Sequence, residues 1–267
     1  MNWNNTMRYT LQELAGMIDH ALLSPTMTDR EMEAGCAVAL RYQVASVCIK
    51  PYAVPLAARL LAGSHVAVCT VIGFPHGSSA TESKRYETEI ACKEGATEVD
   101  MVINIGKTLS EDWEYVRRDI AAVADEAHRH KALVKVIFET DYITQDTLKI
   151  RLCHICAEAG VEFVKTSTGF GFVKGADGKY DYEGATEANL RLLRAYSPSA
   201  VGVKASGSIR DLDTLILCRD LGCARVGASG TAAMLDEYER RVAASAQGQQ
   251  SEDKENGSAA QLGTGGY

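Results

Sequence analysis

Short apolar segments alternate with amphipathic helical segments along nearly the whole chain, and this alternation is the strongest constraint on the fold. The apolar segments are rich in β-branched residues, as in 66–72 (VAVCTVI) and 133–138 (LVKVIF). Near-continuous apolar strands that alternate with helices predict a parallel sheet covered by helices. We expect strands at 17–20, 44–50, 65–72, 98–102, 133–138, 162–164, 200–204 and 224–227, and helices at 11–15, 29–40, 54–61, 80–94, 113–130, 145–159, 186–196, 212–220 and 231–243.

The number of these units favours one architecture. About eight strand–helix units close a (β/α)8 barrel, and 267 residues suit one such barrel. A doubly wound open sheet is the main alternative, but it usually has fewer strands and a glycine-rich first turn, whereas residues 20–25 (HALLSP) contain no glycine. We therefore predict an α/β fold with a single domain, a (β/α)8 TIM barrel over residues 10–246. A lead of residues 1–9 precedes it, and the Gln-, Gly- and Ser-rich residues 247–267 predict a flexible C-terminal tail.

Charge and composition exclude several classes of protein. The net charge of −7 argues against a nucleic-acid partner, because a phosphate backbone requires a basic surface. No apolar run approaches the roughly 20 residues of a membrane span, and the start, MNWNN, does not resemble a secretory signal. Most of the eight cysteines lie inside apolar patterns, as reduced cysteines do. We expect a cytoplasmic protein with no membrane partner, and the oligomeric state stays open, with a homodimer among the alternatives.

The stretch 164–170 (VKTSTGF) carries the clearest chemical signal. A strand delivers Lys165 at its C-terminal end, and hydroxyl residues and a glycine follow directly. A lysine is costly to bury as an ammonium, and the neutral amine is a nucleophile that forms Schiff bases with carbonyl substrates. The alternative is a lysine that extends from the strand end to solvent. The stretch alone does not decide between these interpretations.

Other polar residues lie on or near the ends of the predicted strands. In a barrel these ends line one cavity, so we expect the following residues to share it: Asp19, Lys50, Asp100, Lys135, Lys165 and Lys204. Each alone could form a salt bridge inside the barrel. Together they suggest a mechanism, because an ammonium beside another lysine makes the neutral amine more populated at neutral pH. Lys204 is the candidate neighbour of Lys165, and Asp100 is the candidate for moving protons.

Three glycine- and serine-rich stretches are candidates for binding a phosphate group. They are Thr168–Gly169, Ser206–Ser208 and Gly227–Gly230. Backbone N–H groups, small residues and helix N-termini bind phosphate, and the last two stretches follow the seventh and eighth strands, where such barrels often place a phosphate. Each stretch singly is a weak signal, because Gly/Ser turns are common.

Two patterns resemble metal or redox sites, and we interpret both otherwise. Cys153 and Cys156 lie inside a predicted helix without a second ligand pair, so core or surface cysteines are the better interpretation. A catalytic zinc site would need clustered histidines at strand ends, and only His20 and His76 are candidates. We therefore predict no metal.

Four stretches resemble the deoxyribose-phosphate aldolases: 18–20 (IDH), 98–106 (EVDMVINIG), 164–170 (VKTSTGF) and 203–207 (VKASG). The similarity runs from about residue 10 to about residue 240, and the second and third stretches are specific. The resemblance implies a metal-free class I aldolase on a (β/α)8 barrel without a cofactor. Such an enzyme reversibly cleaves 2-deoxy-D-ribose 5-phosphate to acetaldehyde and D-glyceraldehyde 3-phosphate, so the expected partners are a phosphorylated sugar and aldehydes.

The resemblance also implies roles for individual residues. Lys165 matches the Schiff-base lysine of the family, Lys204 the lysine that perturbs it, and Asp100 the proton-transfer acid. Some members end in a tyrosine on a mobile tail, which makes Tyr267 a candidate for proton transfer; its alternative is a terminal residue without a role. We expect Lys135 and Cys48 to support these residues. The candidates for binding substrate and phosphate are Asp19, Thr168, Gly169, Gly207, Ser208, Gly227, Ser229 and Gly230.

The sequence departs from the family pattern at three positions. Ser208 replaces the second glycine of a Gly-Gly phosphate turn and adds a Cβ where the backbone approaches the anion. Phe170 stands where some members have a lysine, and Ala21 where many have a threonine. These departures concern phosphate preference more than aldolase chemistry. Two alternatives remain open: another Schiff-base aldolase for a different sugar phosphate, and a non-catalytic barrel that binds a sugar phosphate.

Overall fold

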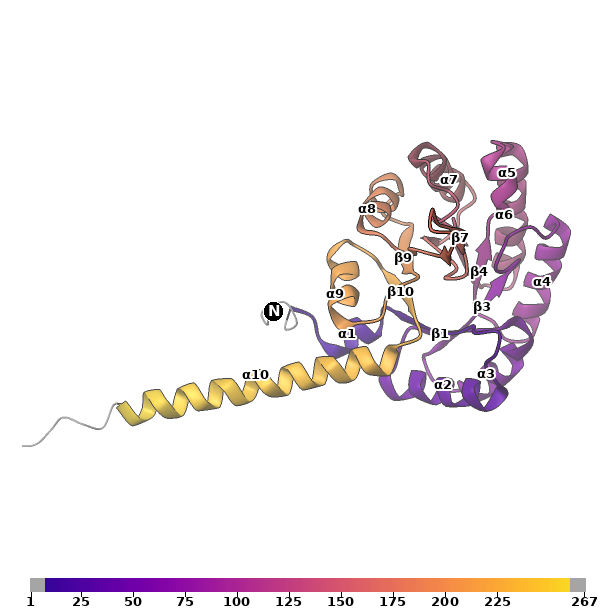
Figure 1. Cartoon of the computed structure of the whole chain (residues 1–267). Coiled ribbons are helices and arrows are strands. Elements are labelled where there is room, and N and C mark those ends of the chain that lie inside the picture. Colours follow the sequence, from indigo (N-terminus) through magenta and orange to yellow (C-terminus); the bar gives the residue numbers. More distant parts are fainter. Residues whose placement is uncertain (1–7, 260–267) are drawn as a thin grey trace, which may run out of the picture.

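The computed structural model describes residues 8–259, with side chains for residues 8–245. Eight parallel strands form a closed barrel in the order β1-β10-β9-β6-β5-β4-β3-β2, and helices surround it (Figure 1). The strands are β1 (Ile18–Leu22), β2 (Ser46–Ile49), β3 (Ala67–Ile72), β4 (Glu98–Val102), β5 (Leu133–Ile137), β6 (Phe163–Lys165), β9 (Gly202–Ser206) and β10 (Arg225–Ala228). Because β1 pairs with both β2 and β10, the sheet has no edge; the predicted barrel is confirmed and the doubly wound sheet is excluded.

The helices follow the strands in the predicted order. They are α1 (Leu11–Ala15), α2 (Asp29–Tyr42), α3 (Val54–Leu60), α4 (Thr81–Lys93), α5 (Ile105–Leu109), α6 (Trp113–Arg129), α7 (Asp146–Glu158), α8 (Glu187–Tyr196), α9 (Leu212–Asp220) and α10 (Thr231–Ala259), with a short 3-10 helix η2 (Pro51–Ala53) before α3. Capping boxes at Thr10 and Thr28 define where α1 and α2 begin. The sequence did not predict α5, a single turn that starts where the Asn104 side chain accepts a hydrogen bond from the Lys107 N–H.

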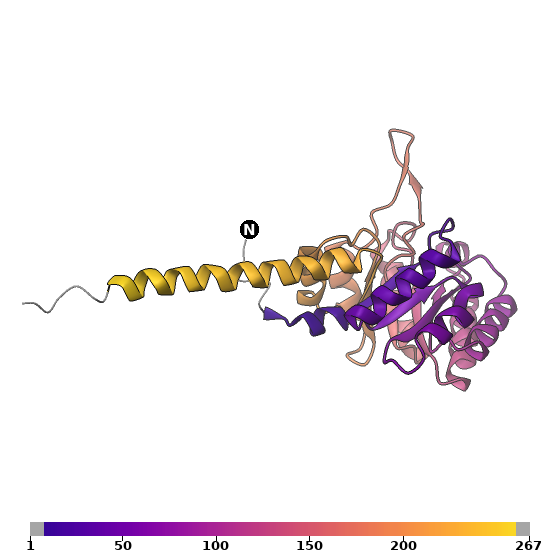
Figure 2. The same cartoon turned by 90° about the horizontal axis from the view of Figure 1, so that it is seen from below.

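Two segments differ from the sequence prediction. Residues 171–184, expected to be a plain connection, contain the antiparallel hairpin β7 (Val173–Lys174) and β8 (Tyr180–Asp181). The hairpin projects from the barrel, and so does α10 (Figure 2). Helix α10 continues to Ala259, beyond residue 247, where we predicted the tail to begin. The Gln, Glu, Lys and Ala residues of 247–259 favour a helix, but Gly248 and Gly257 disfavour one, so local propensity alone does not account for this extension.

The core lies between the strands and the covering helices. Its members are mostly Val, Ile, Leu and Ala, and their burial supplies the main free energy of folding. One charged pair is buried with them: Lys84 on α4 and Asp119 on α6 meet at 2.6 Å and are almost completely inaccessible to solvent. Among the described residues, no helix combines the length and apolar content that crossing a membrane requires.

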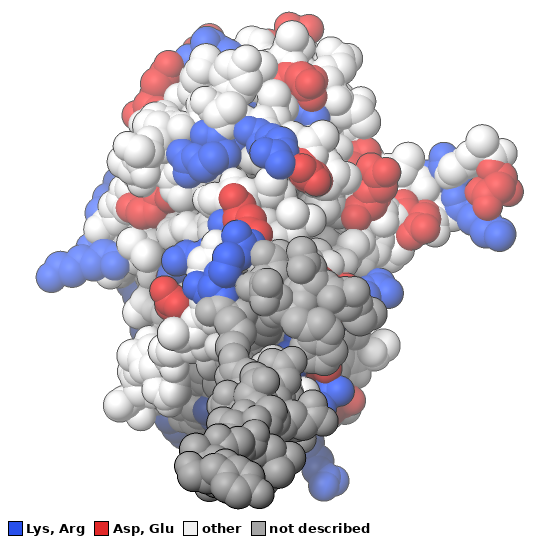
Figure 3. Space-filling view, turned by 90° about the vertical axis from the view of Figure 1, so that its left-hand side faces the viewer, with Lys and Arg blue, Asp and Glu red and all other residues white. Residues whose placement is uncertain are grey.

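Positive and negative side chains are interspersed on the face shown in Figure 3, and the described residues visible there form no continuous basic surface. Binding to a nucleic-acid backbone requires such a surface. This face therefore has none of the charge pattern expected of a nucleic-acid interface.

Candidate active site

Strand register brings the sequence-predicted lysines and aspartates together. Lys165 at the end of β6 lies directly opposite Lys204 on β9. Asp100 on β4 lies directly opposite Lys135 on β5. Inward-facing residues of a barrel meet at its centre, so four side chains from four strands converge there.

The carboxylate of Asp100 joins the three amines. Its Oδ2 accepts hydrogen bonds from the Nζ atoms of both Lys165 and Lys204, each at 2.7 Å, and its Oδ1 accepts from Lys135 Nζ at 2.8 Å. Lys165 and Lys204 are therefore neighbours through one shared oxygen atom. The sequence predicted that Lys204 and Asp100 lie near Lys165, but not that Asp100 lies between the two amines.

Two more carboxylates and a guanidinium complete a lysine network beneath the cavity. Asp19 accepts hydrogen bonds from Lys204 Nζ at 2.5 Å and Arg225 Nη1 at 2.6 Å. Glu98 lies 2.7 Å from Lys135 Nζ and 2.9 Å from Arg225 Nη2. We define the lysine network as these residues: Asp19, Glu98, Asp100, Lys135, Lys165, Lys204 and Arg225. Its four cations face three carboxylates, which leaves one positive charge in excess.

The network holds Asp19, Asp100 and Lys204 in their charged forms. Burial alone would raise the pKa of Asp100, but the ammonium groups of Lys135, Lys165 and Lys204 hold it well below its usual range. The positive charges of Lys135, Lys204 and Arg225 lower the pKa of Asp19 in the same way. Burial disfavours the ammonium of Lys204, yet Asp100 and Asp19 outweigh this and raise its pKa. Lys204 is thus a fixed positive charge beside Lys165.

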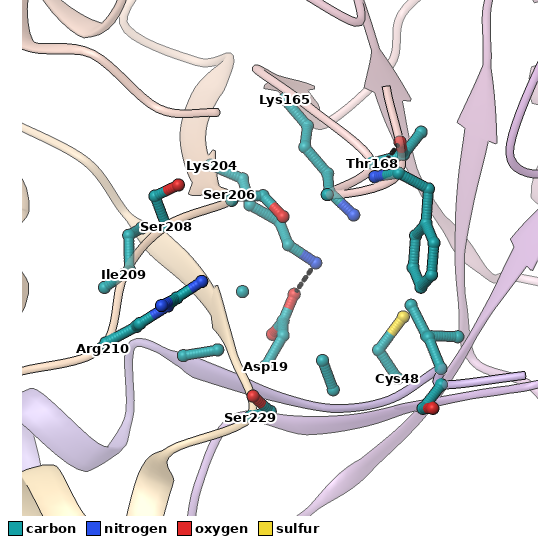
Figure 4. Close-up of a pocket in the computed structure, with 18 of the residues that line it drawn as sticks. Asp19, Cys48, Lys165, Thr168, Lys204, Ser206, Ser208, Ile209, Arg210 and Ser229 are labelled. Carbon is teal, nitrogen blue, oxygen red and sulfur yellow. Dashed lines mark hydrogen bonds and ion pairs between the residues drawn. The ribbon is translucent and has the colours of Figure 1, made fainter. Parts of the chain in front are cut away.

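A cavity of about 300 Å³ opens above the network, at the C-terminal ends of the strands. Figure 4 shows Lys165 and Lys204 extending into it from neighbouring strands, with Asp19 next to Lys204 and Cys48 on the far side. The predicted site residues that line it are Asp19, Cys48, Lys165, Thr168, Gly169, Lys204, Gly207, Ser208, Gly227 and Ser229.

The other predicted site residues lie elsewhere. Asp100 and Lys135 are buried beneath the cavity as parts of the network. Gly230 lines a neighbouring hollow beside His20 instead. The Lys50 amine donates to backbone carbonyls of residues 24 and 27. Tyr267 lies outside the described residues, so its role stays a prediction.

One end of the cavity is suited to an anion. Gly207 and Ser208 both have positive φ, 91° and 62°, so the backbone turns sharply at the predicted phosphate turn. Ser208 is therefore a non-glycine residue in the left-handed region, as its replacement of a glycine implies. The Arg210 side chain points into the cavity from the same turn, and no carboxylate of the described residues pairs with it (Figure 4). The sequence analysis did not select Arg210, although a cation two residues after a Gly-Ser turn is a recognisable signal.

Glu139 is a second residue that the sequence analysis did not select. It has a positive φ of 53°, and its buried carboxylate accepts hydrogen bonds from the Thr168 N–H and hydroxyl. Burial raises its pKa from 4.5 to about 7, against the hydrogen bonds from Thr168. The buried carboxylate of Glu139, a residue with a strained backbone, thus holds the loop that follows Lys165. No sequence motif indicates this contact.

Metal ligands are scarce near the cavity. In the described chain, the single cluster of His, Cys and carboxylate ligand atoms is Cys48, Cys69 and Asp100, whose atoms lie within 4.8 Å of one another. Both oxygens of Asp100 already accept from ammonium groups, which compete with a cation. His20 bonds to Thr231 Oγ1 at 2.8 Å, and burial lowers its pKa to about 4. His76 is exposed, and neither histidine belongs to a cluster of metal-ligand atoms among the described residues.

A buried lysine cluster that opens into the mouth of a (β/α)8 barrel suits carbonyl chemistry at an amine. A family model described as DeoC/LacD family aldolase matches residues 14–239. The chain belongs to this family and is an aldolase.

Individual relatives agree with this assignment. A deoxyribose-phosphate aldolase of Rhodopirellula baltica is 45% identical over 234 residues, covering 88% of this chain and 92% of the relative. One of Clostridium perfringens is 46% identical over 225 residues, covering 84% and 95%. Among solved structures, a putative deoxyribose-phosphate aldolase of Coccidioides immitis is similar with a TM-score of 0.79 and 34% identity, covering 86% of this chain and 87% of that one.

Proposed function

We propose that this aldolase reversibly cleaves 2-deoxy-D-ribose 5-phosphate to acetaldehyde and D-glyceraldehyde 3-phosphate through a Schiff base on Lys165. The observation that carries the proposal is the shared Asp100 oxygen: the amines of Lys165 and Lys204 both lie 2.7 Å from it at the floor of the cavity. The names of the relatives support the substrate.

In the cleavage direction, the neutral Lys165 amine attacks C1 of the open-chain sugar aldehyde and forms a carbinolamine. Loss of water produces the protonated Schiff base, which accepts the electron pair of the C2–C3 bond as that bond breaks. The C3 hydroxyl loses its proton and becomes the aldehyde of glyceraldehyde 3-phosphate. The remaining enamine takes a proton at C2, and water then releases acetaldehyde and the free amine.

The lysine network supplies the charges that these steps need. Lys204 is a cation beside the reacting amine, and a neighbouring positive charge favours loss of a proton from an amine. Asp100 is within hydrogen-bond distance of both Lys165 and Lys204, so it can relay a proton between the reacting centre and Lys204. Asp19 is an anion engaged with Lys204 and Arg225, so we assign it to the network rather than to phosphate.

The proposed phosphate end of the cavity consists of the turn at residues 206–208 together with Ser229 and Arg210. Serine hydroxyls, backbone N–H groups and an unpaired guanidinium all bind phosphate oxygens. Arg210 supplies a positive charge in a chain where Phe170 replaces the lysine of some relatives.

The compartment and the assembly belong to this proposal as well. All eight cysteines are free, which supports a reducing compartment such as the cytoplasm. A homodimer stays a prediction that a mass measurement in solution decides.

Trapping with borohydride tests the proposal. We expect acetaldehyde and borohydride together to leave an ethyl group on Lys165, identified by peptide mass spectrometry, and to abolish activity. Lys165→Arg is the control and should gain no adduct. A wild-type protein that binds the sugar phosphate but forms no adduct is the non-catalytic barrel. An adduct combined with turnover of a different sugar phosphate would indicate another Schiff-base aldolase.

A further inference from the structure

The β7–β8 hairpin projects away from the barrel (Figure 2), and the cavity is lined by a residue at the base of the hairpin. Tyr182, the first residue after β8, lines the cavity together with Gly207, Ser208 and Arg210. The residues on both sides of it, Asp181 and Glu183, are exposed, whereas Tyr182 is partly buried. The hairpin thus contributes one side chain to the proposed phosphate end.

The base of the hairpin is fixed by hydrogen bonds from a separate loop. The Asp141 carboxylate accepts from the backbone N–H of Glu183 at 2.6 Å and of Gly184 at 3.1 Å. On the outgoing side, the Tyr142 hydroxyl donates to the backbone carbonyl of Phe172 at 3.0 Å. Both strands of the hairpin are therefore attached to the loop after β5.

The returning strand also packs directly on the phosphate turn. A Cβ added to Gly184 would lie 2.6 Å from the carbonyl carbon of Gly207, so only glycine permits this approach of the two backbones. The Ala185 N–H donates to the Gly207 carbonyl at 3.3 Å. This contact sets the position of Tyr182 relative to the turn.

The ring of Tyr182 lies over the turn and is supported from outside. Its edge would be 3.6 Å from a Cβ at Gly207, and the Phe172 ring contacts it edge-on with centroids 5.4 Å apart. Among the described residues, none forms a hydrogen bond with the Tyr182 hydroxyl, which leaves this group free to donate to a ligand oxygen.

We infer that Tyr182 determines specificity for a phosphorylated aldehyde, because the hairpin holds its ring and hydroxyl against the end of the cavity that receives the phosphate. The inference rests on the proposed function and deepens it. The ring excludes water from the anion, and the hydroxyl adds a donor to those of the turn and Arg210.

The test compares two aldehydes in the synthetic direction with acetaldehyde: D-glyceraldehyde 3-phosphate and unphosphorylated D-glyceraldehyde. For Tyr182→Ala, we expect the ratio of the two kcat/KM values to fall about tenfold, mainly through a higher KM for the phosphorylated aldehyde. Tyr182→Phe keeps the ring and should show a smaller fall. Asp141→Ala releases the base of the hairpin and should change the ratio in the same direction.

Tyr180→Ala is the matched control, since Tyr180 lies on the same hairpin and is 66% exposed. It should leave the ratio at the wild-type value. The inference is overturned if Tyr182→Ala keeps the wild-type ratio, if it weakens both aldehydes equally, or if Tyr180→Ala has the same effect. A wild-type enzyme without turnover or borohydride adduct would instead overturn the proposed function.

Discussion

Two buried lysines in this barrel have opposite surroundings. Lys84 is paired with one carboxylate, Asp119, and with the backbone carbonyl of Val102 at 2.9 Å. Lys165 belongs to the lysine network, where four cations share three carboxylates. Lys84 lies sealed between two helices and the sheet, whereas Lys165 reaches a cavity.

The difference separates a structural charge from a chemical one. A buried pair with equal charges and full hydrogen bonding has no reason to exchange a proton, and breaking it exposes a bare charge. A network with an excess cation gains when one amine becomes neutral, and an amine that becomes neutral is a nucleophile. Burial alone therefore does not identify a reactive lysine. The charge balance around the lysine and its access to a cavity identify it.

The largest expected effect comes from removing the excess cation. In Lys165→Met, we expect kcat/KM to fall on the order of 10⁴-fold or more, because the nucleophile is lost. The remaining three cations match the three carboxylates, so the free energy of unfolding should stay within about 1 kcal/mol of wild type. Steady-state kinetics and urea unfolding measure the two quantities. A fully active Lys165→Met variant would contradict the chemical role assigned to Lys165.

The second-largest effect is a loss of stability with little loss of activity. Lys84→Met leaves Asp119 buried and unpaired, which costs about 3–5 kcal/mol of unfolding free energy. Specific activity of the folded protein should stay within a few-fold of wild type, because Lys84 lies away from the cavity lining. Calorimetry and the activity of the folded fraction check this. An unchanged melting temperature would contradict the structural role assigned to the pair.

Glu139 sharpens the comparison, because it is a buried carboxyl that has hydrogen bonds but forms no ion pair with any described residue. Its pKa rises from 4.5 to about 7, so its stabilising contribution is present below pH 4.5 and is lost as the pH rises through 7. The loss amounts to about 3 kcal/mol. Unfolding free energies at pH 4.5 and pH 8 should therefore differ less in Glu139→Gln than in wild type. Equal pH dependence in the two proteins would argue against this shift.

The smallest expected effect concerns metal ions. Incubation with a chelator should leave kcat and KM unchanged, because the oxygens of Asp100 in the Cys48–Cys69–Asp100 cluster are engaged by lysines. Activity before and after dialysis against a chelator measures this. Activity that falls on chelation and returns with zinc would show that a metal displaces the lysine contacts.

Most of the barrel could be predicted from the sequence, because each strand and helix carries a local pattern. Apolar β-branched runs and helix caps depend on neighbours in the chain, so the strand before Lys165 and the helix at Leu11–Ala15 are where the sequence places them. The family motifs likewise pointed to Lys165, Lys204 and Asp100. The α5 turn and the β7–β8 hairpin were not predicted, because both are too short to show a hydrophobic periodicity.

The tertiary structure decided which of these residues meet and what charge they share. Lys165 and Lys204 are 39 positions apart in the chain, and only the β6–β9 register sets them opposite each other. The same holds for Asp100 between them and for Tyr182 against Gly207. Local patterns in the sequence determine secondary structure, whereas charge balance and cavity shape depend on distances between strands, which no local pattern contains.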